Sequence, residues 1–166
     1  MNWHAQTALD TEELGFRLAR ARPAPGATPA VVYLTGELGA GKTTFARGFL
    51  HAHGVGGNIP SPTYTLVELY PAGELTIVHV DLYRIADPRE LESLGLREWA
   101  RPGFIWLIEW PERGADGIPP PDLALEFRVG ASAHDIELTA RSKLGESWLA
   151  ALAQVPSGQE TRSARS

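Results

Sequence analysis

A run of glycines and hydroxyl residues around one lysine, Gly36 to Thr44 (GELGAGKTT), is the stretch of the sequence best suited to chemistry. It matches the phosphate-loop pattern G-x-x-x-x-G-K-[ST] at every fixed position. Glycines let the main chain approach a polyphosphate without a Cβ in the way, so that backbone N–H groups converge on its oxygens. The sequence therefore predicts a binding site for a nucleoside triphosphate.

Each position of this stretch has an expected role. Lys42 brings a charge to the β- and γ-phosphates, and the hydroxyl of Thr43 binds Mg²⁺. We expect the nucleotide-binding residues to be Glu37, Leu38, Gly39, Ala40, Gly41, Lys42, Thr43 and Thr44. A glycine turn with a surface lysine is the alternative. The flanking sequence argues against it, because an apolar strand pattern precedes the loop and a helix pattern, closed by Gly54, follows it.

Two acidic residues follow apolar strand patterns elsewhere in the chain. Asp81 comes directly after LTIVHV, and Glu109 comes directly after FIWLI. Carboxyl ends of parallel strands meet at one edge of a sheet, where a phosphate loop also lies. Each carboxylate could instead cap a helix or pair with a nearby arginine. Their common placement in a chain with a phosphate loop favours a role with Mg²⁺ for both carboxylates.

The segment NIPSPTYT, residues 58–65, follows the predicted phosphate-loop helix. Other nucleoside triphosphatases have at this place a segment that senses the γ-phosphate through a hydroxyl. Ser61, Thr63 and Thr65 are candidates for this role. An ordinary proline-rich turn is the alternative, and spacing alone favours that turn.

Histidines carry no predicted role. His51, His53, His79 and His134 show no spacing typical of metal ligands. A histidine inside a strand, such as His79, is more typical of packing than of ligation. Trp110 could stack on a base or ribose, although an aromatic residue at the end of a core strand is more typical of packing.

The predicted elements form an α/β domain with a mostly parallel central sheet, flanking helices and antiparallel strands at the edge. We expect helices from Asp10, as the cap, to about Arg22, from Asp87 to Gly95, and over 146–155. We expect strands at Ala30–Leu34, Thr65–Tyr70, Leu75–Val80, Phe104–Ile108, Leu123–Val129 and Asp135–Ala140, and a turn at Pro71–Gly73. The run Phe104–Ile108 is apolar throughout, as in a central strand covered on both faces, whereas the last two strands alternate and suit an antiparallel pair.

Composition limits the possible functions. The formal net charge of −5 argues against a chain that grips nucleic acid by itself, so any contact with RNA is expected through a partner. The absence of cysteine excludes disulfides and thiolate metal sites, and no membrane-spanning run is present. We expect a cytoplasmic protein without membrane contact, with one domain over 1–155 and a disordered tail over 156–166.

Four motifs, in this order, resemble those of the TsaE family, formerly called YjeE. They are GELGAGKTTFARG (Gly36 to Gly48), SPTYTLVELY (Ser61 to Tyr70), HVDLYRI with ADPRELESLG (His79 to Gly95), and LIEWPE (Leu107 to Glu112). The first motif is generic, whereas SPTYTLVE and DLYRI together are close to diagnostic. Glu37 stands where Asp is common in the family, at a position that contributes mainly a backbone N–H group.

The resemblance implies a P-loop fold that binds ATP with Mg²⁺ and hydrolyses it feebly alone. It implies action with TsaB and TsaD, which attach a threonylcarbamoyl group to N6 of adenosine 37 in tRNAs reading ANN codons. By motif, Lys42, Asp81 and Glu109 are the expected catalytic residues, and Thr43 and Glu109 the Mg²⁺ pair. Apart from the resemblance, we suggest the segment near Thr7 and the turn at Ala133 for contacts with the base.

Two other functions remain open at this point. A small-molecule kinase would need an arginine lid, which Arg84, Arg89, Arg97 and Arg101 could imitate, although their segment resembles a helix surface. A nucleotide-switched binding module without turnover is the second alternative. A GTPase is disfavoured because no N-K-x-D or T-K-x-D motif occurs in the chain.

Overall fold

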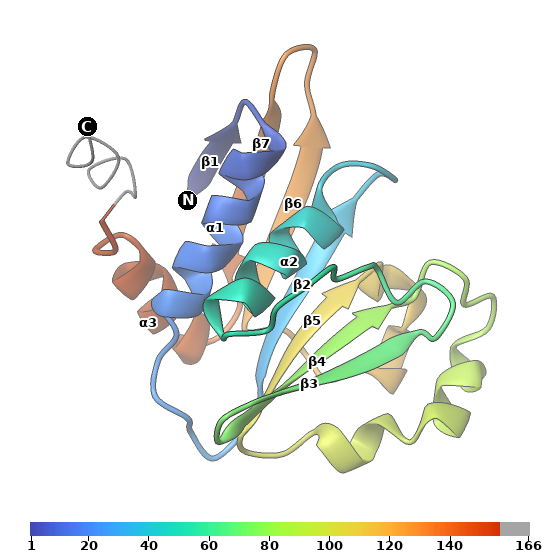
Figure 1. The fold of residues 1–166 in the computed structure, drawn as a ribbon. Coiled ribbons are helices and arrows are strands. Elements are labelled where there is room, and N and C mark those ends of the chain that lie inside the picture. The colour runs from blue at the N-terminus through green and yellow to red at the C-terminus, as the bar shows by residue number, and fades with distance from the viewer. Residues whose placement is uncertain (157–166) are drawn as a thin grey trace.

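The computed structural model describes residues 1–156, and the predicted tail lies outside them apart from Pro156. Seven strands form a single sheet (Figure 1). They are β1 (Asn2–Ala5), β2 (Ala30–Gly36), β3 (Val67–Ala72), β4 (Leu75–Asp81), β5 (Phe104–Glu109), β6 (Leu123–Val129) and β7 (His134–Ala140). The helices are α1 (Ala8–Arg20), α2 (Lys42–Ala52) and α3 (Lys143–Leu152), with short 3-10 helices η1 (Pro88–Leu94), η2 (Leu96–Trp99), η3 (Pro111–Arg113) and η4 (Ala115–Gly117).

The strand order β1-β7-β6-β2-β5-β4-β3 confirms the predicted fold class. β2 pairs in parallel with β5 on one side and with β6 on the other, and β4 pairs in parallel with β5. β1, β3 and β7 pair antiparallel with their neighbours. The parallel centre places the carboxyl ends of β2, β4 and β5 at one edge, from which the phosphate-loop stretch leads into α2.

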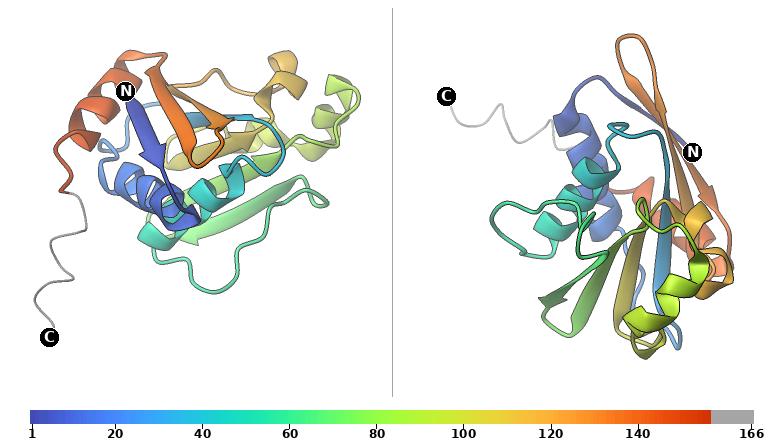
Figure 2. Two further views of the ribbon diagram at one scale, coloured as in Figure 1. Left: turned by 90° about the horizontal axis from the view of Figure 1, so that it is seen from above. Right: turned by 90° about the vertical axis from the view of Figure 1, so that its right-hand side faces the viewer.

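Apolar side chains cover both faces of the central strands. One core lies between the sheet and the three α-helices, and Phe45, Phe49 and Trp148 are fully buried in it. The second core, around Trp106, lies on the other face and includes Leu91 of η1 and Leu96 of η2. Figure 2 shows that these short helices lie on the side of the sheet away from α1 and α2. Two-sided burial explains why β5 is apolar almost throughout.

Two glycines allow α1 and α2 to pack with their backbones nearly in contact. A Cβ at Gly48 would lie 1.9 Å from the carbonyl oxygen of Glu12, and a Cβ at Gly15 would lie 2.1 Å from that of Phe45. Neither distance is compatible with a larger residue at this crossing. Close packing against α1 fixes the position of α2, and therefore of its first turn, which follows the phosphate loop.

Several predicted boundaries were wrong. α1 begins at Ala8 with Thr7 as its cap, and Asp10 is the third helical residue of a capping box, in which its carboxylate accepts from the Thr7 N–H group. β1 was not predicted. Pro71 belongs to strand β3, because an edge strand tolerates a proline, and the hairpin turn is at Gly73 and Glu74. The segment after Asp87 is capped as predicted, but it forms a 3-10 helix.

Among the described residues, the model contains no helix with the length and apolar character needed to cross a bilayer.

Candidate nucleotide site

The loop between β2 and α2 has the shape of an anion-binding turn. Gly41 caps α2 with φ +106°, a left-handed conformation that an L side chain rarely adopts. Because Gly41 has no side chain to bond the first N–H groups of α2, these groups and the positive end of the helix are left for a ligand. Glu37, Leu38 and Gly39 are exposed, whereas Ala40 is fully buried and anchors the turn.

Lys42 lies folded over this loop. Its Nζ donates to the carbonyl oxygens of Gly36, at 2.6 Å, and Glu37, at 2.8 Å. The ammonium group also lies 4.4 Å from the centre of the Trp110 ring. Burial lowers the pKa of Lys42, and the nearby charges of Glu109, Asp81 and Glu112 oppose that shift. The charge is thus partly desolvated and close to where the pattern places the β- and γ-phosphates.

Glu109 lies at the end of β5, buried beside the first turn of α2. The hydroxyl of Thr43 is 3.0 Å from its Oε1 and 3.2 Å from its Oε2. The Nε2 atom of His79, on β4, lies 2.8 Å from Oε1. The two residues predicted as Mg²⁺ ligands are therefore in direct contact, whereas the contact with His79 was not predicted.

Asp81 lies at the end of β4 and binds the segment after α2. Ser61 donates to Oδ2 at 2.5 Å and Thr63 donates to the same oxygen at 3.1 Å. The backbone N–H of Tyr83 donates to Oδ1 at 2.9 Å. Thr65 is exposed and makes no hydrogen bond to this carboxylate. Two of the three predicted hydroxyls thus gather at Asp81, and the third does not.

The two carboxylates are register partners, since Asp81 lies opposite Glu109 in the parallel pair of β4 and β5. Within residues 1–156, no group of three or more His, Cys, Asp or Glu side chains is arranged to hold a metal ion. Proteins usually bind Mg²⁺ through one or two side-chain oxygens while water and substrate phosphates complete the shell. The Thr43 hydroxyl and the Glu109 carboxylate are oxygen donors that could hold such an ion.

A hollow next to the loop includes one of the two positions suggested for the base. Thr7, Thr11, Gly41 and Thr44 line it together with His134, whose Nδ1 lies 3.0 Å from the carbonyl oxygen of Ala40. Ala133 does not line this hollow; it lies in the turn between β6 and β7, where its carbonyl oxygen accepts from the N–H group of Gly130. The two positions suggested for contacts with the base stay predictions.

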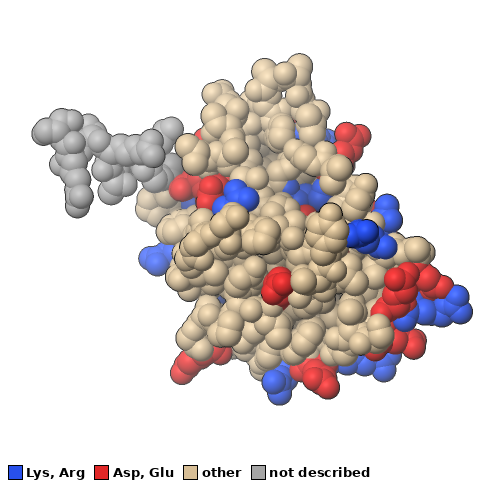
Figure 3. All heavy atoms as spheres, turned by 45° about the vertical axis from the view of Figure 1, so that its right-hand side comes forward, with Lys and Arg blue, Asp and Glu red and all other residues tan. Residues whose placement is uncertain are grey.

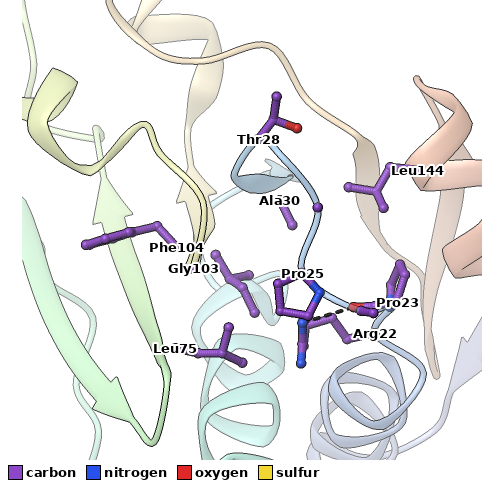
Figure 4. Close-up of a pocket in the computed structure, with 12 residues that line it drawn as sticks. Arg22, Pro23, Pro25, Thr28, Ala30, Leu75, Gly103, Phe104 and Leu144 are labelled. Atoms are coloured by element: carbon purple, nitrogen blue, oxygen red, sulfur yellow. Dashed lines mark hydrogen bonds between the residues drawn. The ribbon is translucent and has the colours of Figure 1, made fainter.

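A separate pocket lies at the opposite edge of the sheet (Figure 4). It is formed by the segment between α1 and β2, by the start of β4 and by the start of β5, with Arg22 bonded to the carbonyl of Pro23. The amino ends of parallel strands lie there, away from the phosphate loop and from both carboxylates. This pocket therefore plays no part in the candidate nucleotide site.

Three of the four arginines considered for a kinase lid have partners outside the phosphate loop. Arg89 pairs with Asp87, and Arg101 lies over the ring of Phe104 at the amino end of β5. Arg84 stacks on the exposed Tyr64 at 4.8 Å. No hydrogen bond or ion pair joins these three guanidinium groups to the phosphate loop in the described chain.

Comparison with known proteins identifies the family of this chain. Residues 5–138 match the family model described as "Threonylcarbamoyl adenosine biosynthesis protein TsaE". The TsaE protein of Haemophilus influenzae is 47% identical over 121 residues, 73% of this chain and 77% of its own, and that of Bacillus subtilis is 34% identical over 141 residues, 84% and 85%. The crystal structure of Bacillus subtilis YdiB superposes with a TM-score of 0.75 and 28% identity, covering 93% of this chain and 94% of its own. Matched over most of its length by sequence and by fold, the chain belongs to the TsaE family.

Proposed function

We propose that this protein is a Mg²⁺-dependent ATP-binding protein and weak ATPase that acts in threonylcarbamoyladenosine formation on tRNA. The proposal depends above all on one observation, the contact of the Thr43 hydroxyl with Glu109 at 3.0 Å beside the lysine of a phosphate loop. The family to which the chain belongs, and the names of its relatives, support the role in tRNA modification.

Each group at the site has a separate role in the proposed hydrolysis of ATP. Backbone N–H groups at the start of α2 bind the phosphate oxygens, and Lys42 exchanges its carbonyl partners for the β- and γ-phosphates. Thr43 and Glu109 would hold Mg²⁺, which neutralises charge that develops on the transferred group. Asp81, whose two oxygens already accept three donors, is placed to orient groups near the γ-phosphate.

We further propose that TsaB and TsaD are the partners and that they complete the site. The segment that donates to Asp81 also contains Tyr64, which is 86% exposed. This segment could therefore contact a docked partner on one side and the region of the γ-phosphate on the other. Positive and negative side chains are interspersed on the described part of the face in Figure 3. With a net charge of −5, contact with tRNA is expected only through the complex.

Phosphate release from γ-labelled ATP, measured with and without TsaB and TsaD, tests the activity. We expect slow release from the chain alone and at least about a tenfold increase with both partners, a small part of what a partner-supplied group contributes in GTPases. Equal rates would contradict completion by partners. Label transferred to a small acceptor would favour a kinase, and tight binding without any release would favour a nucleotide-switched module.

The lysine provides a matched pair of variants. Lys42→Ala should weaken ATP binding by about 10- to 100-fold, because a charge-assisted hydrogen bond contributes about 1.5–3 kcal/mol. Lys143→Ala changes an exposed lysine on α3, far along the chain from the loop, and should leave the affinity unchanged. Isothermal titration calorimetry measures the ATP affinity of both variants. Equal affinities would contradict the assignment of residues 36–44 as the phosphate-binding loop.

A further inference from the structure

A buried histidine lies behind Glu109 and has no role in the function proposed above. His79 has an exposed fraction of 0%, and the Nε2 atom of its ring lies 2.8 Å from Oε1 of Glu109. Its Nδ1 atom is buried and has no hydrogen-bond partner in the described chain. Burying a polar ring with one unsatisfied nitrogen costs about 1–3 kcal/mol, so an apolar residue would suit a purely structural position better.

The pleat of β4 explains how the ring reaches the carboxylate. Side chains two residues apart share one face of a strand, so His79 points to the same side as Asp81. The register places His79 opposite Leu107 and Asp81 opposite Glu109. His79 therefore approaches Glu109 diagonally, from one layer deeper in the core. Within residues 1–156, Oε2 accepts a hydrogen bond from the hydroxyl of Thr43 alone, whereas Oε1 also contacts the core-side imidazole.

We propose that His79 is a positioning residue that orients the Glu109 carboxylate toward the Mg²⁺ of the bound nucleotide, an inference that rests on the proposed function. A carboxylate only accepts hydrogen bonds, so the hydrogen of this bond is on Nε2 of the ring. The bond selects one rotamer of a flexible side chain and leaves Oε2 for an ion beside Thr43. Outer-shell partners of this kind change metal affinity by about 10- to 100-fold when they are removed.

Two substitutions separate the hydrogen bond from the shape of the side chain. His79→Leu removes the donor, whereas His79→Gln keeps an N–H group near the position of Nε2. Mg²⁺ is expected to increase the affinity for ATP, and the Mg²⁺ concentration that gives half of this increase is the quantity to measure. We expect His79→Leu to raise that concentration by about 10- to 100-fold. ATP affinity without Mg²⁺ should stay within about threefold, because Lys42 and the loop backbone set it. His79→Gln should behave like the unmodified chain.

A matched control lies two residues earlier on the same face of β4. Ile77→Val makes a small cavity in the same core without touching Glu109, and it should leave the Mg²⁺ dependence unchanged. Circular dichroism checks that every variant is folded, and His79→Met replaces His79→Leu if the latter does not fold. If His79→Leu keeps the unmodified Mg²⁺ dependence, or if His79→Gln loses it equally, the inference is wrong.

The unmodified chain offers an independent measurement. Imidazole ¹H–¹⁵N spectra should place the His79 hydrogen on Nε2, with a signal that shifts in Glu109→Gln and on adding Mg-ATP. A hydrogen found only on Nδ1 would overturn the inference even if ATP binding behaves as proposed. Absence of any Mg²⁺-dependent gain in ATP affinity in the unmodified chain would instead overturn both proposals.

Discussion

Glu109 and Asp81 are neighbours in the sheet, yet their carboxylates are bound to different parts of the molecule. Glu109 contacts Thr43 on α2 and His79 on β4, both of which belong to regular elements. Asp81 contacts Ser61 and Thr63, which lie in the irregular segment after α2. One acid is thus fixed by the framework of sheet and helix, and the other joins a loop to that framework.

This difference separates two tasks at the site. A carboxylate held by a helix and a strand keeps its position whether or not the loop moves, which suits a ligand of an ion. A carboxylate that binds hydroxyl groups of a loop changes its hydrogen bonds when the loop moves, and this suits a residue that senses the γ-phosphate. Substitutions should therefore change charge alone at Glu109, and both charge and loop order at Asp81.

The largest effect is expected for Glu109→Gln. The amide keeps the size of the side chain and can still accept from His79, but it removes the charge that faces the ion. We expect ATP hydrolysis to fall by about 100- to 1000-fold, comparable to the loss of one preorganised electrostatic group in other enzymes. Phosphate release under single-turnover conditions measures it.

The control for this variant is the segment 61–65. Its protection from hydrogen exchange should match that of the unmodified chain, because Glu109 makes no bond to it. Loss of protection in this segment would mean that a change at Glu109 also alters the loop bound to Asp81.

A smaller loss of activity with a change in the loop is expected for Asp81→Asn. Oδ1 accepts from the Tyr83 N–H group while Oδ2 accepts from Ser61 and Thr63, and an amide has only one oxygen to serve both sides. We expect hydrolysis to fall by about 10- to 100-fold and residues 61–65 to exchange faster. Hydrogen exchange followed by mass spectrometry detects the second effect, and unchanged exchange would contradict the proposed link to the loop.

The smallest effects should follow removal of single hydroxyls. Ser61→Ala and Thr63→Val each remove one donor to Asp81, and each should lower hydrolysis by about 3- to 10-fold, equivalent to roughly 1 kcal/mol per hydrogen bond. Thr65→Val is the matched control, since Thr65 is exposed and makes no bond to that carboxylate. A loss in Thr65→Val as large as in Thr63→Val would argue for a direct role of the third hydroxyl.

Much of this arrangement was predictable from local patterns. The central strands, the start of α2 and the strand-end positions of Asp81 and Glu109 follow from apolar runs and glycine spacing. β1 was missed because its four residues carry little apolar signal and form a strand only by pairing with β7. The contact between His79 and Glu109 was also not predicted, although the place of His79 two residues before Asp81 put it on the same face of β4.

By itself, the sequence determined the phosphate-loop pattern and the two strand-end acids, since both are set by neighbours along the chain. Only the tertiary structure decided which donors reach which carboxylate. The contacts of Glu109 span 66 residues to Thr43 and 30 to His79, and Ser61 lies 20 residues from Asp81. Such contacts depend on strand order and register, and a shift of one residue would turn each side chain to the opposite face of the sheet.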